Sequence, residues 1–208
     1  MTSPEQGSEH GLERNLAGVF QSWWNRLNDV AKDGAGKDRA ALARLRRITM
    51  ARDDTPDVLA ALNEPAFRQL CVVVDRVWGL HELADDRVER LLTVAVTLAQ
   101  IKQDAPGQST AGLLGGKDDP DRAMKEGRFL AFMRAESPAE LFEQARRLPA
   151  LLKGKAPVGE LGASLLLWTS RPAIRRNWAR QYYHLDLRGR ENRAPEYQSP
   201  SEPEQTGA

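Results

Sequence analysis

The sequence predicts an all-α protein. Apolar residues recur three and four positions apart almost throughout the 208 residues, the spacing that places them on one face of a helix. No sustained apolar-polar alternation appears, and no Asn-Gly turn joins alternating runs, so neither strands nor hairpins are expected. Prolines and capping residues divide the chain repeatedly. We therefore expect about nine helices, arranged as two small helical bundles joined by a Gly/Pro/Ser-containing loop.

Helices in the first half are identified by their apolar stripes and their first residues. The first is expected over about 12–31, where apolar residues share one face and Trp24 lies at the edge of that face. The later helices are expected to begin at a capping aspartate or a first-turn proline: Asp38, Pro56, Pro65, and Asp85 or Asp86.

Residues 102–120 combine Gly, Pro, Ser and Asp without helical periodicity. Such a composition is typical of a loop, so we place the boundary between two lobes here. The expected organisation is an N-terminal helical lobe over 12–101, a connecting loop over 102–120, a basic C-terminal lobe over 121–187 and a disordered tail over 188–208.

Capping signals divide the C-terminal lobe as well. Asp119 or Asp121 is expected to open its first helix. Ser137 and Glu140 form a capping-box pattern with a proline between them, which is a specific helix-start signal. Pro149 should end or kink that helix. Two final helices are expected to open at Pro157 and Pro172.

The charge of the chain is segregated. The formal net charge is only +1, yet residues 146–193 hold eleven Lys and Arg against three Asp and Glu, a local charge of +8. Residues 53–90 hold nine acidic and four basic side chains, a local charge of −5. A basic module of this kind points to a polyanionic partner, and the acidic segment is unsuited to nucleic acid.

Catalytic and metal-binding patterns are lacking. His10, His81 and His184 are far apart and no HExxH or Cys/His pattern includes them. The segment 111–118 departs from a phosphate-binding loop, since it begins with Ala and ends Gly-Lys-Asp. We expect no enzyme activity, no cofactor and no metal. Four tryptophans lie on apolar stripes and are expected in the core and not on bases: Trp23, Trp78, Trp168 and Trp178.

No apolar run reaches the roughly 18 to 20 residues of a membrane span, and the N-terminus has no signal-peptide pattern. We therefore expect a cytoplasmic protein that does not contact a membrane.

A series of segments between about residues 15 and 187 matches a known pattern in order and spacing. These are Trp23-Trp24, Ala40–Ile48 with Arg46-Arg47, Pro65-Ala66-Phe67, Ser109–Gly115, Gly127-Arg128-Phe129 leading to Met133-Arg134-Ala135, Arg146-Arg147-Leu148 leading to Leu151–Lys155, and Ser164–Ser170 leading to Ile174–Tyr183. In these segments the chain resembles the CasB family, the small subunit of the type I-E CRISPR surveillance complex Cascade.

The resemblance implies a two-lobed, non-catalytic helical subunit of an antiviral ribonucleoprotein complex. Its implied partners are the other Cascade subunits, the guide RNA, the target DNA strands and a second copy of itself. The implied role is to hold DNA of the R-loop by phosphate contacts. Carried over by position, the nucleic-acid-binding candidates are Arg46, Arg47, Lys102, Arg128, Arg134, Arg147, Lys153, Lys155, Arg171, Arg175 and Arg176.

A second interpretation of the same charges stays open. The basic face of a helical protein-protein adaptor can dock an acidic protein instead of nucleic acid. A steep loss of affinity for single-stranded DNA with rising salt favours the first interpretation.

Overall fold

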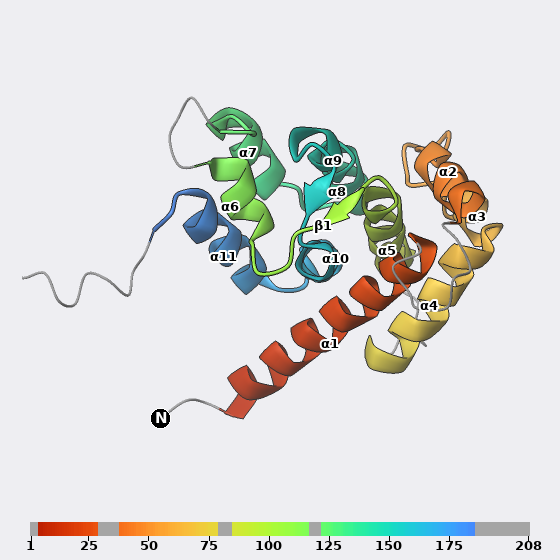
Figure 1. Ribbon diagram of the computed structural model, residues 1–208, viewed down its shortest axis with the longest axis horizontal. Helices are drawn as coiled ribbons and strands as arrows, with labels where there is room; N and C mark the ends of the chain where they lie inside the picture. The colour runs from red at the N-terminus through yellow and green to blue at the C-terminus, as the bar shows by residue number, and fades with distance from the viewer. Residues whose placement is uncertain (1–3, 29–37, 79–84, 117–121, 186–208) are drawn as a thin grey trace, which may run out of the picture.

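The structure is a computed structural model that describes residues 4–28, 38–78, 85–116 and 122–185. Helices dominate it, so the all-α prediction is confirmed (Figure 1). The helices are α1 (Pro4–Leu27), α2 (Arg39–Arg47), α3 (Val58–Leu62), α4 (Pro65–Trp78), α5 (Asp85–Leu98), α6 (Thr110–Gly115), α7 (Glu126–Met133), α8 (Pro138–Ala145), α9 (Leu148–Leu151), α10 (Val158–Leu167) and α11 (Pro172–Tyr182). Two short strands, β1 (Gln103–Asp104) and β2 (Lys155–Ala156), pair in parallel.

Local capping signals fix many of the helix starts. The carboxylate of Asp38 accepts a hydrogen bond from the amide of Ala41 at 2.8 Å, which caps α2. Ser137 and Glu140 form the predicted capping box at the start of α8. Pro172 occupies the first turn of α11, as predicted.

Other boundaries differ from those predicted. Strand β1 and helix α6 both lie within 102–120, where only a loop was expected. Helix α7 begins at Glu126, later than Asp119 or Asp121, which lie outside the described residues. Helix α8 ends at Ala145, and Pro149 lies in the first turn of α9 instead of ending α8. The predicted tail over 188–208 also lies outside the described residues.

Helix α1 runs along one side of the molecule and makes its most extensive contact with α10 (Figure 1). Two glycines of α10 allow the approach. A methyl group at Gly159 would lie 2.7 Å from the carbonyl oxygen of Ala17, and one at Gly162 would lie 2.7 Å from the ring of Phe20. Larger side chains at either position would push the two helices apart.

Both tryptophans of α1 are buried, including Trp24 at the edge of the predicted stripe. Trp23 donates its indole N–H to the carbonyl of Ala66 on α4, at 2.9 Å. Trp24 donates its indole N–H to the carbonyl of Ile101 after α5, at 3.3 Å. Because α1 is covered on two sides, its buried face is wider than one apolar stripe.

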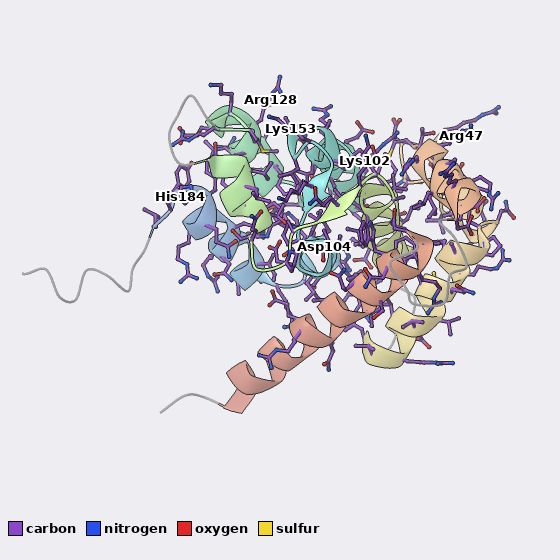
Figure 2. All side chains as sticks on the ribbon, in the orientation of Figure 1. Arg47, Lys102, Asp104, Arg128, Lys153 and His184 are labelled. Atoms are coloured by element: carbon purple, nitrogen blue, oxygen red, sulfur yellow. The ribbon has the colours of Figure 1, made fainter. Side chains whose placement is uncertain are left out.

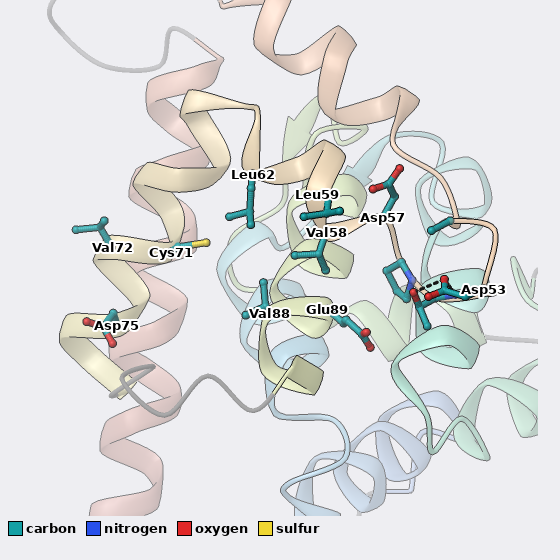
Figure 3. A pocket seen from close by; sticks show the side chains of 13 residues that line it. Asp53, Asp57, Val58, Leu59, Leu62, Cys71, Val72, Asp75, Val88 and Glu89 are labelled. Atoms are coloured by element: carbon teal, nitrogen blue, oxygen red, sulfur yellow. Dashed lines mark hydrogen bonds between the residues drawn. The ribbon is translucent and has the colours of Figure 1, made fainter.

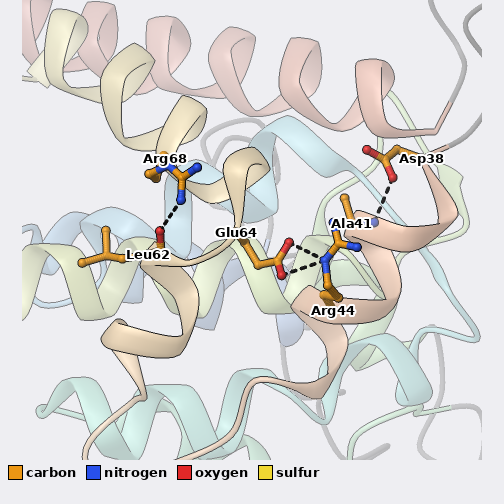
Figure 4. Close-up of polar contacts among 6 residues, drawn as sticks. All are labelled: Asp38, Ala41, Arg44, Leu62, Glu64 and Arg68. Atoms are coloured by element: carbon orange, nitrogen blue, oxygen red, sulfur yellow. Dashed lines mark hydrogen bonds and ion pairs between the residues drawn. The ribbon is translucent and has the colours of Figure 1, made fainter.

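An ion pair joins α2 to the start of α4. Nε of Arg44 lies 2.7 and 2.8 Å from the two carboxylate oxygens of Glu64, which is itself buried (Figure 4). The hydrogen bond from Arg44 to Glu64, together with the charge of that carboxylate, raises the pKa of Arg44.

An aromatic cluster fills the core around α7, α10 and α11. The ring of Phe132 packs against Trp168 and Trp178 at centroid distances of 4.7 and 5.4 Å, and Phe129 stacks on Tyr182 at 3.7 Å. The buried apolar residues of the described chain form one continuous cluster from α1 to α11. The division into lobes at 102–120 remains a prediction.

Candidate nucleic-acid interface

Three of the predicted basic residues meet at the small sheet. Gln103 pairs with Lys155 in the β1–β2 register, so the preceding residue, Lys102, lies opposite Gly154. Gly154 is itself flanked in the sequence by Lys153 and Lys155. Paired backbones are about 4.8 Å apart. The structure therefore brings the backbones of Lys102, Lys153 and Lys155 close to one another from positions about fifty residues apart in the chain. All three side chains are exposed, and we call them the lysine cluster.

The backbone holds the lysine cluster rigidly. The amides of Lys102 and Gln103 both donate to the carbonyl of Gly154, at 2.8 and 3.1 Å. Lys153 and Gly154 have φ angles of 53° and 74°, which turn the chain from α9 into β2. A methyl group at Gly154 would lie 3.3 Å from Cγ and Cδ of Lys102, so the stem of that lysine packs on the glycine.

The neighbouring carboxylate is engaged elsewhere. Oδ1 of Asp104 accepts hydrogen bonds from the amides of Ala105 at 2.9 Å and Val158 at 3.0 Å. Val158 is the first residue of α10, so Asp104 caps that helix from β1. Among the residues that the structure describes, none of the three lysines forms an ion pair. Their charge is therefore available to a bound anion.

Arginines continue the basic surface on either side of the lysine cluster. Nε of Arg46 donates to the carbonyl of Ala99 at 2.7 Å, which ties α2 to the end of α5, three residues before Lys102. Arg47 is exposed at the last position of α2. Arg147 precedes α9 and lies 4.0 Å from Glu143, but both side chains are largely exposed, so solvent screens this pair.

Helix α7 carries two further candidates. Arg128 lies in its first turn and Arg134 follows its last residue, and both are exposed. Figure 2 shows Arg128, Lys153, Lys102 and Arg47 following one another across the upper part of the view, with α1 below them. These four labelled candidates thus lie along one edge of the molecule in this view.

The remaining candidates lie on α11, which packs mainly on α6. Arg176 is exposed, Arg175 is half-buried, and Arg171 caps the helix and is also half-buried. The structure does not bring these three arginines to the lysine cluster, so they form a separate group.

Aromatic stacking contributes little to this surface. Trp23, Trp168 and Trp178 are 5% exposed or less, which confirms their expected place in the core. Trp78, expected in the core as well, is only half-buried and packs against the outside of that core. A surface of exposed cations without exposed aromatic rings suits the phosphate backbone better than unstacked bases.

One neighbour of the lysine cluster had no signal in the sequence. Gln103 is exposed and directly opposite Lys155, on the same face of the sheet. Its position follows from a pairing between two strands of two residues each, too short to show a period. The Lys-Gly-Lys sequence at 153–155 was the only local hint of a turn.

Other kinds of site find no support in the described part of the chain. No group of three or more His, Cys, Asp and Glu side chains there could hold a metal ion. None of the helices in the described ranges is both long and apolar enough to cross a bilayer.

Comparison with known proteins identifies the family of the chain. The family model described as CRISPR-associated protein Cse2 matches residues 41–183, which include the lysine cluster and all the other candidate residues. Searches of curated proteins and of solved structures gave no significant match. The match spans more than half of the chain, and the chain therefore belongs to the Cse2 family, the small subunits of the type I-E CRISPR Cascade complex.

Proposed function

We propose that this Cascade subunit holds DNA of the R-loop through sequence-neutral phosphate contacts made by the lysine cluster and the arginines beside it. The observation that supports the proposal is that the pairing of β1 with β2 places three exposed lysines, Lys102, Lys153 and Lys155, next to one another along the backbone. We assign no catalytic step to the chain. Its proposed partners are the target DNA strands, the guide RNA, the other Cascade subunits and a second copy of itself.

Phosphate contacts suit the task. In guide-directed recognition, base pairing supplies the sequence specificity, and the exchange of one duplex for another is nearly balanced in free energy. A protein subunit can shift that balance with contacts that ignore sequence. Ammonium groups do so because each phosphate they neutralise releases condensed counterions.

The spacing of the candidates supports an extended contact. Helix α9 has four residues and a length of about 6 Å, so Arg147 at its start and Lys153 beyond its end lie within reach of neighbouring phosphates. Arg46 and Arg47 extend the surface toward α2, and Arg128 and Arg134 extend it along α7. A single strand following this side would meet successive cations.

The direct experiment reverses the charge of the lysine cluster. The variant Lys102→Glu, Lys153→Glu, Lys155→Glu should assemble into Cascade normally but bind target DNA on the order of tenfold or more weakly, since three phosphate contacts are lost. Electrophoretic mobility shift with the assembled complex measures the affinity, and permanganate footprinting measures strand opening.

The matched control carries the same change of charge elsewhere. Arg14, Arg26 and Arg76 are exposed on α1 and α4, two helices that carry none of the candidate residues, and their replacement by Glu should leave the affinity within about twofold. Equal losses in the two triple variants would show a general charge effect. Wild-type DNA binding by the lysine variant would refute the proposal.

A second variant tests the arginines on either side of the lysine cluster. Reversing Arg47, Arg134 and Arg147 together should weaken retention of target DNA while the complex still assembles. If assembly fails instead, these arginines contact neighbouring protein subunits. That outcome would favour the interpretation in which these three arginines dock an acidic protein and not nucleic acid.

A further inference from the structure

We propose that a groove between α3, α4 and α5 binds a basic amphipathic helix of a partner protein. The groove has a volume of about 720 Å³ and lies at the end of the molecule formed by α2, α3 and α4 (Figures 1 and 3). It is separate from the lysine cluster, and its occupancy does not depend on the proposed DNA contact.

The floor and edges of the groove are apolar. Val58 and Leu59 of α3, Cys71 of α4 and Val88 of α5 line it from three helices (Figure 3). Burial raises the pKa of the Cys71 thiol to about 11, so this side chain stays neutral and acts as part of the apolar wall.

Several of its large apolar side chains are exposed to solvent. Leu59 is 78% exposed, Val72 is 52% exposed and Leu62 is 40% exposed. They are three of the five exposed large hydrophobic residues in the described chain, and all three line this one groove. Clustered exposure of this kind marks a surface that is covered in an assembly.

The described residues on the rim of the groove carry only negative charge. Asp53, Asp57, Asp75 and Glu89 line it, and none of the other described residues that line it is Lys, Arg or His. The hydroxyl and the amide of Thr55 both donate to Asp53 and hold its pKa below the usual value. The carboxylate of Asp57 accepts from the amide of Ala60 at 2.9 Å, which fixes it at the start of α3.

These features select the occupant. The acidic rim repels nucleic acid. A small molecule is normally enclosed over most of its surface, whereas an edge residue such as Leu59 leaves this groove open. An apolar floor with an acidic rim complements a helix that bears apolar side chains at i, i+3 or i+4, and i+7 with Lys or Arg beside them.

The test uses photocrosslinking in the assembled, DNA-free Cascade complex. A photoreactive phenylalanine analogue replaces Leu59, and a second complex carries it in place of Leu130, an exposed residue on α7 that serves as the control. The Leu59 position should crosslink to a helical segment of another protein subunit, with the apolar spacing and the basic flanks described above. The Leu130 position should not crosslink to that segment.

Substitutions provide the second measurement. Leu59→Lys together with Val72→Lys should reduce retention of the subunit in the complex about tenfold or more, because the added charges repel a basic helix and the apolar contact is lost. Leu130→Lys should leave retention unchanged. Circular dichroism of each variant checks its folding. We expect all of them to fold, because Leu59, Val72 and Leu130 are already exposed in the structure.

Several results would overturn the inference. The inference is wrong if Leu59 crosslinks to a second copy of this chain, to another part of the same chain, or to an acidic or uncharged segment. It is also wrong if Leu59 gives no protein crosslink, or if the double variant is retained in the complex as well as the wild type. Because the complex contains no DNA in this test, its outcome is independent of whether the lysine cluster binds target strands.

Discussion

Adding one methyl group to α10 should separate it from α1. The Cβ of Ala in Gly159→Ala would lie 2.7 Å from the carbonyl oxygen of Ala17, too close for any real contact, so the helices must move apart. In an open helix the same substitution stabilises by roughly 1 kcal/mol. Overpacking costs about 1–3 kcal/mol, and a contact with a backbone carbonyl, which cannot turn aside as a flexible side chain can, belongs to the upper part of that range, about 2–3 kcal/mol. The net expectation is a loss of about 1–2 kcal/mol.

Gly18→Ala on α1 is the matched control. A methyl group at Gly18 meets no atom within 4 Å, so this variant should gain about 0.5–1 kcal/mol from helix propensity alone. Thermal denaturation of the two variants should therefore move in opposite directions, by about 2–4 °C for each kcal/mol in a chain of this size. A Gly159→Ala protein as stable as the wild type would refute the close packing of α1 on α10.

Three further results are expected. Charge reversal of the lysine cluster should reduce the salt dependence of binding to unrelated single-stranded DNA. The slope of log affinity against log salt concentration should fall in magnitude by about 2, because each lost phosphate contact removes about 0.7. Fluorescence anisotropy titrations at several salt concentrations measure this slope, and an unchanged slope would show that the lysines do not contact phosphates. Asp104→Ala should destabilise the protein by about 1 kcal/mol in urea unfolding through loss of the cap on Val158, and an unaltered midpoint would contradict that role. Burial raises the pKa of Glu160 above its usual value, so the folded state binds the proton more tightly than the unfolded state does. The stability from this group therefore falls as the pH rises from that usual value through the raised pKa. Glu160→Gln should remove that fall, and parallel pH profiles of the two proteins would disprove it.

Local chemistry explains why much of the fold could be predicted. The cap at Asp38 and the capping box at Ser137 act within one helical turn, so their residues are adjacent in the sequence. The predicted stripe of α2 buries Leu42 and Leu45 as expected. Such elements carry their own signal because the forces that form them do not depend on the rest of the chain.

Non-local contacts explain what was missed. The β1–β2 pair joins 103–104 to 155–156 and has no periodic pattern, so the meeting of the lysines could not be predicted from spacing. Trp24 was predicted at the edge of the apolar face of the first helix, because a single apolar stripe indicates packing against one partner. In the structure α1 packs on two sides, and the indoles of Trp23 and Trp24 bond to different partners, Ala66 and Ile101. The groove residues Leu59 and Val72 showed ordinary helical spacing, and their exposure appears only in the folded chain.

The packing of α1 on α10 also has a consequence for synthesis on the ribosome. Helix α1 leaves the ribosome first, but α10 follows roughly 130 residues later, on the order of ten seconds at typical elongation rates. Phe20, whose ring packs on Gly162, has no α10 to cover it during that interval, although it is buried in the finished protein. The nascent chain therefore presents an apolar helix to chaperones until its final quarter has been made, and the N-terminal half alone lacks the helix that covers it.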